Sequence, residues 1–270
     1  MSKQRLTITL SKSTLDKVDA LIDDKQIRSR SHSIETLLQQ ALQPDIKLAV
    51  ILAGGDANQY QQIRPLTKID GKPLIVFTLE HLISFGVEHV FILTNQHGKK
   101  IRQAVERYQP AVNLTWIEEK QPLGTAGALS NTAELIDQPF YCLHGDVLTN
   151  IDLQKLAEFH EREQAAATIA VKPRVPHKSY DNVFIQGSQV VDFQPKQEGQ
   201  TVSIVNSGVY LFDPDIFNYI PDKTPSMLEQ DVFPKLSRTD KLFAYAFQGI
   251  WYDVSSDQTY KQAIKKLSTK

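Results

Sequence analysis

The 270-residue chain has a single cysteine, Cys142, so no disulfide can form within it. This cysteine lies in the apolar run of residues 140–143, where a buried structural thiol is expected rather than a reactive one. Net charge is almost absent, because 30 Lys and Arg oppose 31 Asp and Glu, so any contact with nucleic acid must come from a local patch. No apolar run approaches membrane-spanning length and the first residues form no continuous apolar segment. We therefore expect a cytoplasmic protein with no membrane partner.

The rest of the composition, with 41% apolar and 23% charged residues, is that of an ordinary globular protein. A chain of this length can bury a substantial core, and one large domain with one small domain is the natural expectation. The break at Gln43-Pro44-Asp45 supplies the boundary. We therefore predict a small domain over residues 1–44 and a large domain over residues 47–270.

The small domain is predicted to hold one strand and two short helices. Residues 5–10 alternate polar and apolar side chains, which is typical of a half-buried strand. Apolar residues recur at helical spacing over residues 15–22, after serines that can cap a helix, and again over residues 34–42, before Pro44. So short a segment cannot bury enough surface to fold alone, and its lone strand needs a partner, so the pattern predicts a dimer.

This segment resembles the ribbon-helix-helix family, in which two chains pair their strands into a ribbon that enters the DNA major groove. The resemblance implies a homodimer or a dimer of dimers that binds DNA through paired arms. The plainer alternative is an arm that only dimerises the protein. The DNA contacts implied on the strand and at the start of the second helix are Arg5, Thr7, Thr9, Ser29, Arg30 and Ser31.

Beyond residue 47, strands and helices alternate, which predicts an α/β domain with parallel pairing. The apolar run of residues 48–53 ends in Gly54-Gly55, as a buried strand entering a phosphate loop would. Asp146 follows another apolar run and is placed at the carboxyl edge of the sheet, where open α/β sheets bind ligands. Helices are predicted over residues 73–85, 100–107, 125–135 and 257–267, and further strands over residues 90–93, 113–117, 140–143, 167–171, 183–185, 189–193, 206–212 and 249–254.

Six motifs follow one another in a set order along this domain. They are Leu52-Ala53-Gly54-Gly55, residues 71–75, residues 121–128, Gly145-Asp146-Val147, residues 206–210 and Trp251-Tyr252-Asp253-Val254. In this order they resemble the sugar-1-phosphate nucleotidyltransferase family, whose members condense a nucleoside triphosphate with a sugar 1-phosphate and release pyrophosphate. The resemblance implies a Rossmann-like, GT-A-like α/β domain with a mixed, mostly parallel sheet.

The same resemblance implies a site. Two anions must approach each other in this reaction, so Mg²⁺ held by Asp146 and Asp253 would be the main catalytic need, with Arg64 as a catalytic cation. Asn206 and Lys196 would bind the sugar. The nucleotide would be bound by Leu52, Ala53, Gly54, Gly55, Gln121, Gly124 and Thr125.

The phosphate loop departs from the family pattern. After Gly55 the chain lacks the family's glycine-threonine-arginine loop and places Asp56 where the triphosphate charge would lie. A gapless alignment from residues 71–73 puts Arg64 at the family's lysine position. An alternative alignment matches residues 64–67 to the family's arginine-proline-leucine-threonine, but it needs an insertion and a large deletion. The family's sugar-contacting glutamate is missing near Lys196, and Asn182 stands where a sugar-pocket glycine is usual.

These features support three hypotheses for the function. The main one is a DNA-binding transcriptional regulator whose degenerate domain senses a nucleotide, a nucleotide sugar or a sugar phosphate. The alternative is an active sugar-1-phosphate nucleotidyltransferase dimerised by the arm. The third is a structural assembly with a vestigial ligand site. Loss of cations from the loop favours weak or lost catalysis, although the sequence leaves that question open.

Overall fold

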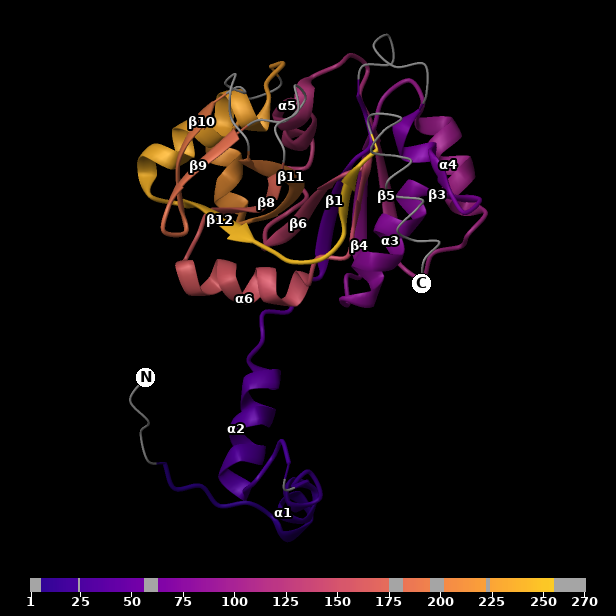
Figure 1. Ribbon diagram of the computed structural model, residues 1–270. Helices are drawn as coiled ribbons and strands as arrows, with labels where there is room; N and C mark the ends of the chain where they lie inside the picture. Colours follow the sequence, from indigo (N-terminus) through magenta and orange to yellow (C-terminus); the bar gives the residue numbers. More distant parts are fainter. Residues whose placement is uncertain are drawn as a thin grey trace. The chain divides into compact units, whose positions relative to one another are not determined.

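The computed structural model of the protein describes residues 6–23, 25–55, 63–174, 182–194, 202–221 and 224–254. Contacts within the chain separate two compact units, Met1–Pro44 and Asp45–Lys270 (Figure 1). None of the helices built from the described residues is long and apolar enough to cross a bilayer.

The N-terminal unit holds two helices, α1 (Lys12–Asp19) and α2 (Arg30–Ala41). Ser11 caps α1, because its side chain accepts a hydrogen bond from Thr14 N at 3.2 Å. Residues 6–10, predicted as a strand, have no regular secondary structure in this single chain, and all five are exposed. An isolated strand leaves its backbone groups without partners, so the alternating pattern alone does not form one.

The core of this unit is small. Val18 is its one buried apolar residue among those described, while large side chains of residues 6–10 and of α2 are exposed, including Ile8, Leu37 and Leu38 at 46%, 40% and 51%. The predicted DNA-binding residues Thr7, Thr9, Ser29, Arg30 and Ser31 are all exposed, and Arg5 lies outside the described residues. Arg30 is held by Asp19 through two hydrogen bonds of 2.6 and 2.7 Å, so its guanidinium already has an anionic partner.

The C-terminal unit is built on a sheet of nine strands in the described residues, in the order β5-β4-β1-β6-β11-β8-β12-β10-β9. β1, β4, β5 and β6 pair in parallel, as do β8 and β12, whereas the other neighbours pair antiparallel. The sheet is therefore mixed as predicted, but it is not mostly parallel. Its strands are β1 (Leu48–Leu52), β4 (His89–Thr94), β5 (Asn113–Glu118), β6 (Phe140–His144), β8 (Ala167–Arg174), β9 (Asn182–Gln186), β10 (Gln189–Gln194), β11 (Ser203–Phe212) and β12 (Leu242–Ala246).

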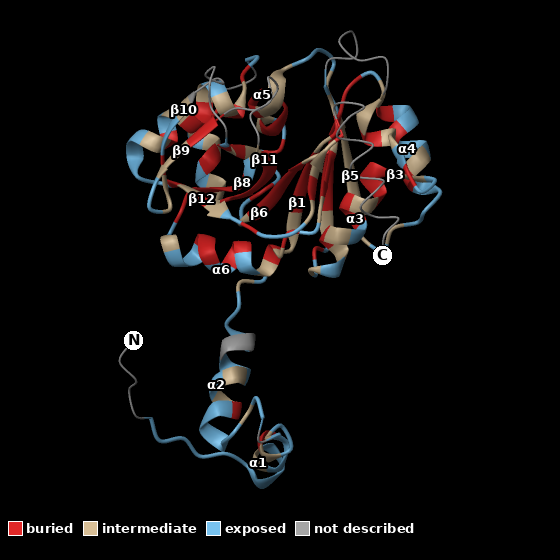
Figure 2. Ribbon diagram, in the orientation of Figure 1, coloured by how far each residue is buried: buried red, intermediate tan, exposed pale blue. Residues whose placement is uncertain are grey.

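Helices cover both faces of this sheet (Figure 1). Alternate residues of β1 point to opposite faces, with Ala49 and Ile51 in one buried cluster and Val50 in the other. The first cluster includes side chains of α3 (Leu74–Ser84), α4 (Gly98–Glu106) and α6 (Leu153–Glu163). The second includes side chains of α5 (Gly124–Ser130), the π-helical turn η3 (Leu228–Val232) and α7 (Phe233–Leu236). Burial is accordingly concentrated in the central strands (Figure 2), and Cys142 on β6 is fully buried as predicted.

Most predicted elements of this unit are confirmed within a few residues, but several regions differ. The helix predicted over residues 125–135 ends at Ser130, and residues 131–135 continue as turns. The helix α6 and the strand β12 were not predicted, although Asp152 caps α6 by accepting a hydrogen bond from Lys155 N at 3.1 Å. The helix predicted over residues 257–267 lies outside the described residues.

Short elements complete the unit and bring distant segments together. The strand β7 (Val147–Thr149) pairs antiparallel with β13 (Trp251–Asp253), so that Asp253 lies opposite Val147. A small hairpin joins β2 (Lys68–Ile69) to β3 (Lys72–Pro73) just before α3. The remaining short helices are η1 (Arg64–Leu66), η2 (Pro214–Tyr219) and η4 (Ser237–Thr239).

Candidate active site

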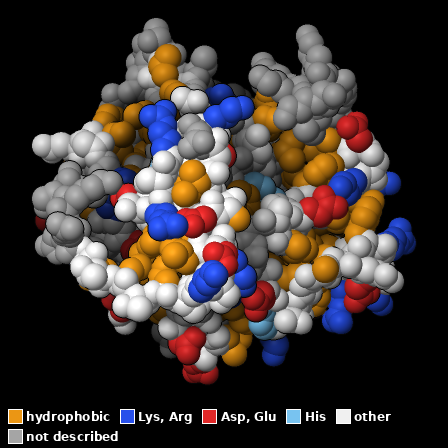
Figure 3. Space-filling view, turned by 90° about the horizontal axis from the view of Figure 1, so that it is seen from below, with side chains coloured by type: hydrophobic (Ala, Val, Ile, Leu, Met, Phe, Trp, Pro, Cys, Tyr) orange, Lys and Arg blue, Asp and Glu red, His pale blue; other side chains and the backbone are white. Residues whose placement is uncertain are grey.

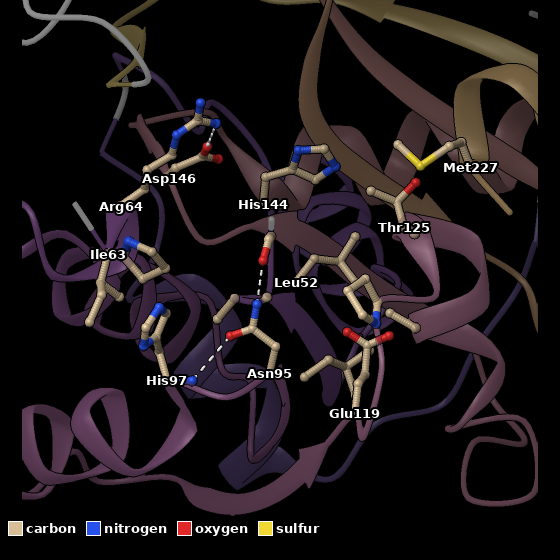
Figure 4. A pocket seen from close by; sticks show the side chains of 18 residues that line it. Leu52, Ile63, Arg64, Asn95, His97, Glu119, Thr125, His144, Asp146 and Met227 are labelled. Atoms are coloured by element: carbon tan, nitrogen blue, oxygen red, sulfur yellow. Dashed lines mark hydrogen bonds and ion pairs between the residues drawn. The ribbon is translucent and has the colours of Figure 1, made fainter. Parts of the chain in front are cut away.

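A cavity of about 370 Å³ opens where β1, β4 and β6 end (Figure 4). Side chains from η1, from the segment after β5 and from the start of α5 complete its wall. The cavity therefore lies at the carboxyl edge of the parallel strands, where Asp146 was predicted to lie. Among its lining residues are Leu52, Ala53, Gly54, Gly55, Arg64, Gly124, Thr125 and Asp146, all predicted from the sequence.

The floor of the cavity is made by tightly packed backbone at the ends of β1 and β6. Ala53 N donates to Leu93 O at 2.8 Å, and Gly145 N donates to Leu52 O at 2.9 Å. A Cβ on Gly145 would lie 3.2 Å from both Leu52 O and Ala53 Cα, so any larger residue would push these neighbours apart by a few tenths of an ångström. Asn95 holds the first residues of the predicted phosphate loop, Gly54-Gly55, in place, because its side-chain amide donates to Gly55 O.

Gly124, the first residue of α5, forms part of the cavity wall. Its φ of +74° is in the left-handed region, and an added Cβ would overlap Ser226 O and lie 2.8 Å from Met227 Sδ. The neighbouring backbone is bonded to the same residue, since Ala126 N donates to Ser226 O at 3.0 Å. Glycine at position 124 is thus required both by conformation and by space.

Gly124→Ala is expected to lower the free energy of unfolding by about 2–4 kcal/mol, measured by urea titration. Gly71→Ala is the matched control, because Gly71 also has a positive φ, +82°, but an added Cβ would meet no atom within 4 Å. That control should lose only about 1 kcal/mol. Equal losses in the two variants would show that the overlap with Ser226 does not exist in solution.

Arg64 and Asp146 form an ion pair at one end of the cavity (Figure 4). Arg64 Nη1 lies 3.0 Å from Asp146 Oδ2, and the two side chains are 23% and 20% exposed. Val254 N donates to Asp146 O at 3.1 Å, and Asp253 lies opposite Val147 in the β7–β13 pairing, so the backbones of Asp253 and Asp146 are neighbours. Asp253 itself is not among the residues that line this cavity.

Glu119 lies at the other end of the cavity (Figure 4) and was missed from the sequence. Burial raises its pKa to about 7, although a hydrogen bond from the Leu123 backbone acts in the opposite direction. Its Oε1 has no hydrogen-bond partner among the described residues. A Cβ on Gly54 would lie 3.2 Å from Glu119 Oε2, so the glycine of the phosphate loop makes room for this carboxylate.

The other predicted ligand residues lie apart from the cavity wall. Gln121 is exposed and does not line the cavity. Lys196 lies outside the described residues, and Asn182 is buried on β9. Asn206 also does not line the cavity, but its Nδ2 donates to Tyr210 Oη at 2.8 Å and to Glu229 Oε1 at 3.3 Å.

A polar network connects Asn206 to the cavity. Tyr210 Oη donates to Glu229 Oε1 at 3.1 Å, and Thr125 Oγ1 donates to Glu229 Oε2 at 3.3 Å. Thr125 lines the cavity, and so does His144, whose Nε2 lies 3.4 Å from Tyr210 Oη. Glu229 comes from the π-helical turn η3, and a sequence pattern tuned to regular helices gives no signal for such a turn.

Comparison with known proteins identifies the family to which this chain belongs. The sequence model of the family described as Nucleotidyl transferase matches residues 48–270. The chain belongs to this family. The nucleotidyl transferase match covers the whole mixed sheet, all the cavity-lining residues and the β7–β13 pairing, so the resemblance stated from the six motifs is confirmed for this part of the chain.

Relatives of this nucleotidyl transferase include enzymes whose names state both the nucleotide and the sugar phosphate. A mannose-1-phosphate guanyltransferase of Yarrowia lipolytica is 30% identical over 223 residues, covering 78% of this chain and 61% of that protein. A mannose-1-phosphate guanylyltransferase catalytic subunit beta of Xenopus tropicalis is 27% identical over 224 residues, covering 78% of this chain and 62% of that protein. The aligned part thus spans about three fifths of the length of these relatives.

Solved structures share the fold of the nucleotidyl transferase unit. HddC from Yersinia pseudotuberculosis, in a complex with GMP-PN, superposes with a TM-score of 0.71 at 24% identity, covering 82% of this chain and 100% of that one. A UDP-glucose pyrophosphorylase in a complex with UDP-glucose superposes with a TM-score of 0.69 at 19% identity, covering 83% and 99%. At these identities the likeness establishes the GT-A-like α/β fold.

The main hypothesis from the sequence, a DNA-binding regulator, is wrong. The relatives are mannose-1-phosphate guanylyltransferases and the family is one of nucleotidyl transferases, which supports the alternative of an active sugar-1-phosphate nucleotidyltransferase. Of the predicted DNA-binding residues, Arg30 is paired with Asp19. On the face in Figure 3, the Lys and Arg side chains of the described residues are interspersed with Asp and Glu. The hypothesis failed because a strand-helix-helix pattern of about forty residues is too short to specify a ligand.

Proposed function

We propose that the chain is a sugar-1-phosphate nucleotidyltransferase that uses GTP. In the reaction, a phosphate oxygen of the sugar 1-phosphate attacks the α-phosphorus of GTP. The bond from that phosphorus to the bridging oxygen breaks, and pyrophosphate leaves. The observation that carries the proposal is the placement of Asp146, Arg64 and the Gly54-Gly55 backbone around one cavity in a member of the nucleotidyl transferase family.

The cavity has the polarity that a guanine nucleotide needs. Guanine presents two neighbouring donors, N1–H and the N2 amino group, and a carboxylate can accept from both. Glu119 offers such a carboxylate, with one oxygen that lacks a partner among the described residues, at the end of the cavity away from Arg64 and Asp146 (Figure 4). The base would then lie at Glu119 and the phosphates at Arg64. Glu119 takes the role that the sequence resemblance implied for Gln121.

The residues at the other end suit Mg²⁺. Among the described residues no cluster of three or more His, Cys, Asp or Glu side chains could enclose a metal ion. Mg²⁺ does not need one, because it binds through one or two carboxylates and completes its shell with water and substrate phosphates. Asp146 and Asp253 would supply oxygen ligands of this kind, and the β7–β13 register sets Asp253 opposite Val147, the residue that follows Asp146. When bound there, Mg²⁺ would neutralise charge on the α-phosphate.

The chain's own residues would bind and orient the two substrates. Arg64 would bind phosphate oxygens of the nucleotide, since a guanidinium matches their geometry. The backbone at Gly54 and Gly55 would approach the nucleotide closely. On the sugar side, the network of Asn206, Tyr210 and Glu229 would position Thr125 and His144, the two side chains through which it reaches the cavity.

The test is pyrophosphate release by the purified full chain with Mg²⁺. GTP, ATP, CTP and UTP are each combined with mannose 1-phosphate and with glucose 1-phosphate. We expect release with GTP to exceed release with the other nucleotides by at least about a hundredfold in kcat/KM, because two charge-assisted hydrogen bonds depend on the base. The absence of release with all eight combinations would refute an enzymatic function.

We also infer that the N-terminal unit joins two copies of the chain. Its described residues bury a single apolar side chain, Val18, which is too little to stabilise a unit of this size, while Leu6, Ile8 and Leu10 are exposed on alternate positions. Pairing residues 6–10 of two copies would satisfy their backbone groups and cover these side chains.

Light scattering should therefore give twice the chain mass of 30.5 kDa. Ile8→Asp with Leu10→Asp should reduce it to the mass of one chain, because charges on the paired face would be buried without partners. Val202→Asp, at an exposed apolar position in the other unit, is the control and should leave the dimer intact. A wild-type chain that scatters as a monomer would exclude this assembly.

A further inference from the structure

Asp146, the carboxylate on which the proposed function depends, already has a cationic partner. Arg64 Nη1 lies 3.0 Å from its Oδ2, and more than three quarters of each side chain is buried. A pair shielded to this degree is screened less by water and salt than a surface pair. The guanidinium is therefore bonded to the carboxylate that a divalent cation would need.

Arg64 is also the one Lys or Arg among the described residues that line the cavity. A bound triphosphate would have this guanidinium as its nearest described cation, and phosphate oxygens accept from arginine in the same two-pronged geometry as a carboxylate. Asp146 and the triphosphate are thus alternative partners for a single side chain. A guanidinium and a divalent cation on the same carboxylate would repel each other.

The backbone around Arg64 is anchored, so that the side chain is the part that can move. Leu66 N donates to Ile63 O at 2.8 Å, and Thr67 N donates to Arg64 O at 2.9 Å. Pro65 is buried, and a Cβ on Gly145 would lie 3.2 Å from Pro65 Cγ. The short helix η1 is therefore packed against the strand end that carries Asp146.

We propose that Arg64 is a transferable counter-ion. It neutralises Asp146 while the site is empty and moves to the phosphates when the nucleotide enters, which frees Asp146 for the divalent cation. Nucleotide and metal then bind with positive coupling, because each favours the state in which the Arg64–Asp146 pair is broken. The inference rests on the proposed function, since it takes the cavity as a site for a nucleoside triphosphate.

The first test is Mn²⁺ binding to the full chain without nucleotide. Binding is measured from the decrease in the electron paramagnetic resonance signal of free Mn²⁺. Arg64→Gln should bind Mn²⁺ about tenfold more tightly than the wild type, because the competing cation is gone. Asp146→Asn should lose this binding, which locates the ion. Arg102→Gln removes an arginine from an exposed pair with Glu106 and should match the wild type, which controls for net charge.

The second test is GTP binding without metal, measured by calorimetry in EDTA. Arg64→Gln should weaken it about tenfold, whereas Asp146→Asn should strengthen it, because Arg64 is then available to the phosphates from the start. Opposite changes in the affinities for Mn²⁺ and GTP in Arg64→Gln are expected only if Arg64 exchanges between Asp146 and the phosphates. A residue with a merely structural role would weaken both.

Mn²⁺ affinity in Arg64→Gln that equals or falls below the wild-type value would overturn the inference, while GTP-dependent pyrophosphate release would still uphold the proposed function. No Mn²⁺ binding by any variant would overturn the inference together with the metal assignment. No GTP binding by any variant would overturn the proposed function itself. These failures are distinguishable because the three measurements are made separately on the same proteins.

Discussion

Asp146→Asn is expected to lower the rate of pyrophosphate release by about a thousandfold, the loss typical when one preorganised charge at the reacting phosphate is removed. Asparagine keeps the size of the side chain, and the backbone of residue 146 stays bonded through Val254 N. The variant loses the negative charge that would attract the metal. Loss of the pair with Arg64 should also lower the melting temperature, so kcat is compared at a temperature at which both proteins are folded.

The measurement is kcat for pyrophosphate release from GTP and a sugar 1-phosphate, with circular dichroism to verify the fold. Asp137→Asn, which removes an exposed carboxylate, is the matched control and should retain wild-type activity. An Asp146→Asn protein that turns over at more than about a tenth of the wild-type rate would exclude a direct role for this carboxylate in the reaction.

Glu119→Gln is expected to lower the preference for GTP over UTP by about a hundredfold in kcat/KM. The side-chain amide of glutamine would meet one of the two guanine donors with a donor of its own, and each lost charge-assisted hydrogen bond weakens binding by about 1.5–3 kcal/mol. Glutamine also offers one donor and one acceptor, the pattern that uracil matches. Glu118→Gln, a substitution at the exposed neighbouring position, is the control and should keep the preference for GTP.

The same residue predicts a pH dependence. Burial raises the pKa of Glu119 to about 7, and guanine needs the ionised carboxylate as acceptor. Below pH 7 the carboxyl must release its proton before GTP binds, so the affinity should rise with pH up to about 7 and then level off. Calorimetry across pH 5.5–8.5 checks this. A wild-type slope that persists unchanged in Glu119→Gln would assign the titration to another group.

Several features of the fold could be predicted from the sequence because they depend on local periodicity. The apolar run of β1 and the helical spacing of α3 are read from neighbouring residues alone, and both lie where predicted. The order of the six motifs was equally readable, and it led to the nucleotidyl transferase family that the comparisons establish for residues 48–270. The alternation of residues 5–10 was just as clear locally, but a strand also needs a partner, which periodicity does not supply.

The placement of the site residues was decided by tertiary structure. The pairing of Arg64 with Asp146 joins residues 82 positions apart and follows from η1 packing beside the end of β6. Glu119 lines the cavity and Gln121 does not, and the chain after β5 is still bonded to the end of β4 at this point, since Glu119 N donates to Thr94 O at 2.8 Å. Glu229 reaches Tyr210 only through the π-helical turn.

The sequence by itself therefore determined the class of the large unit, its central strands and the loops that line the cavity, since each is written in consecutive residues. Only the tertiary structure decided which charges meet: Arg64 with Asp146, Arg30 with Asp19, and Glu119 with no partner at its Oε1 among the described residues. Interaction between charges depends on distance and burial, and neither quantity is encoded in the spacing of residues along a chain.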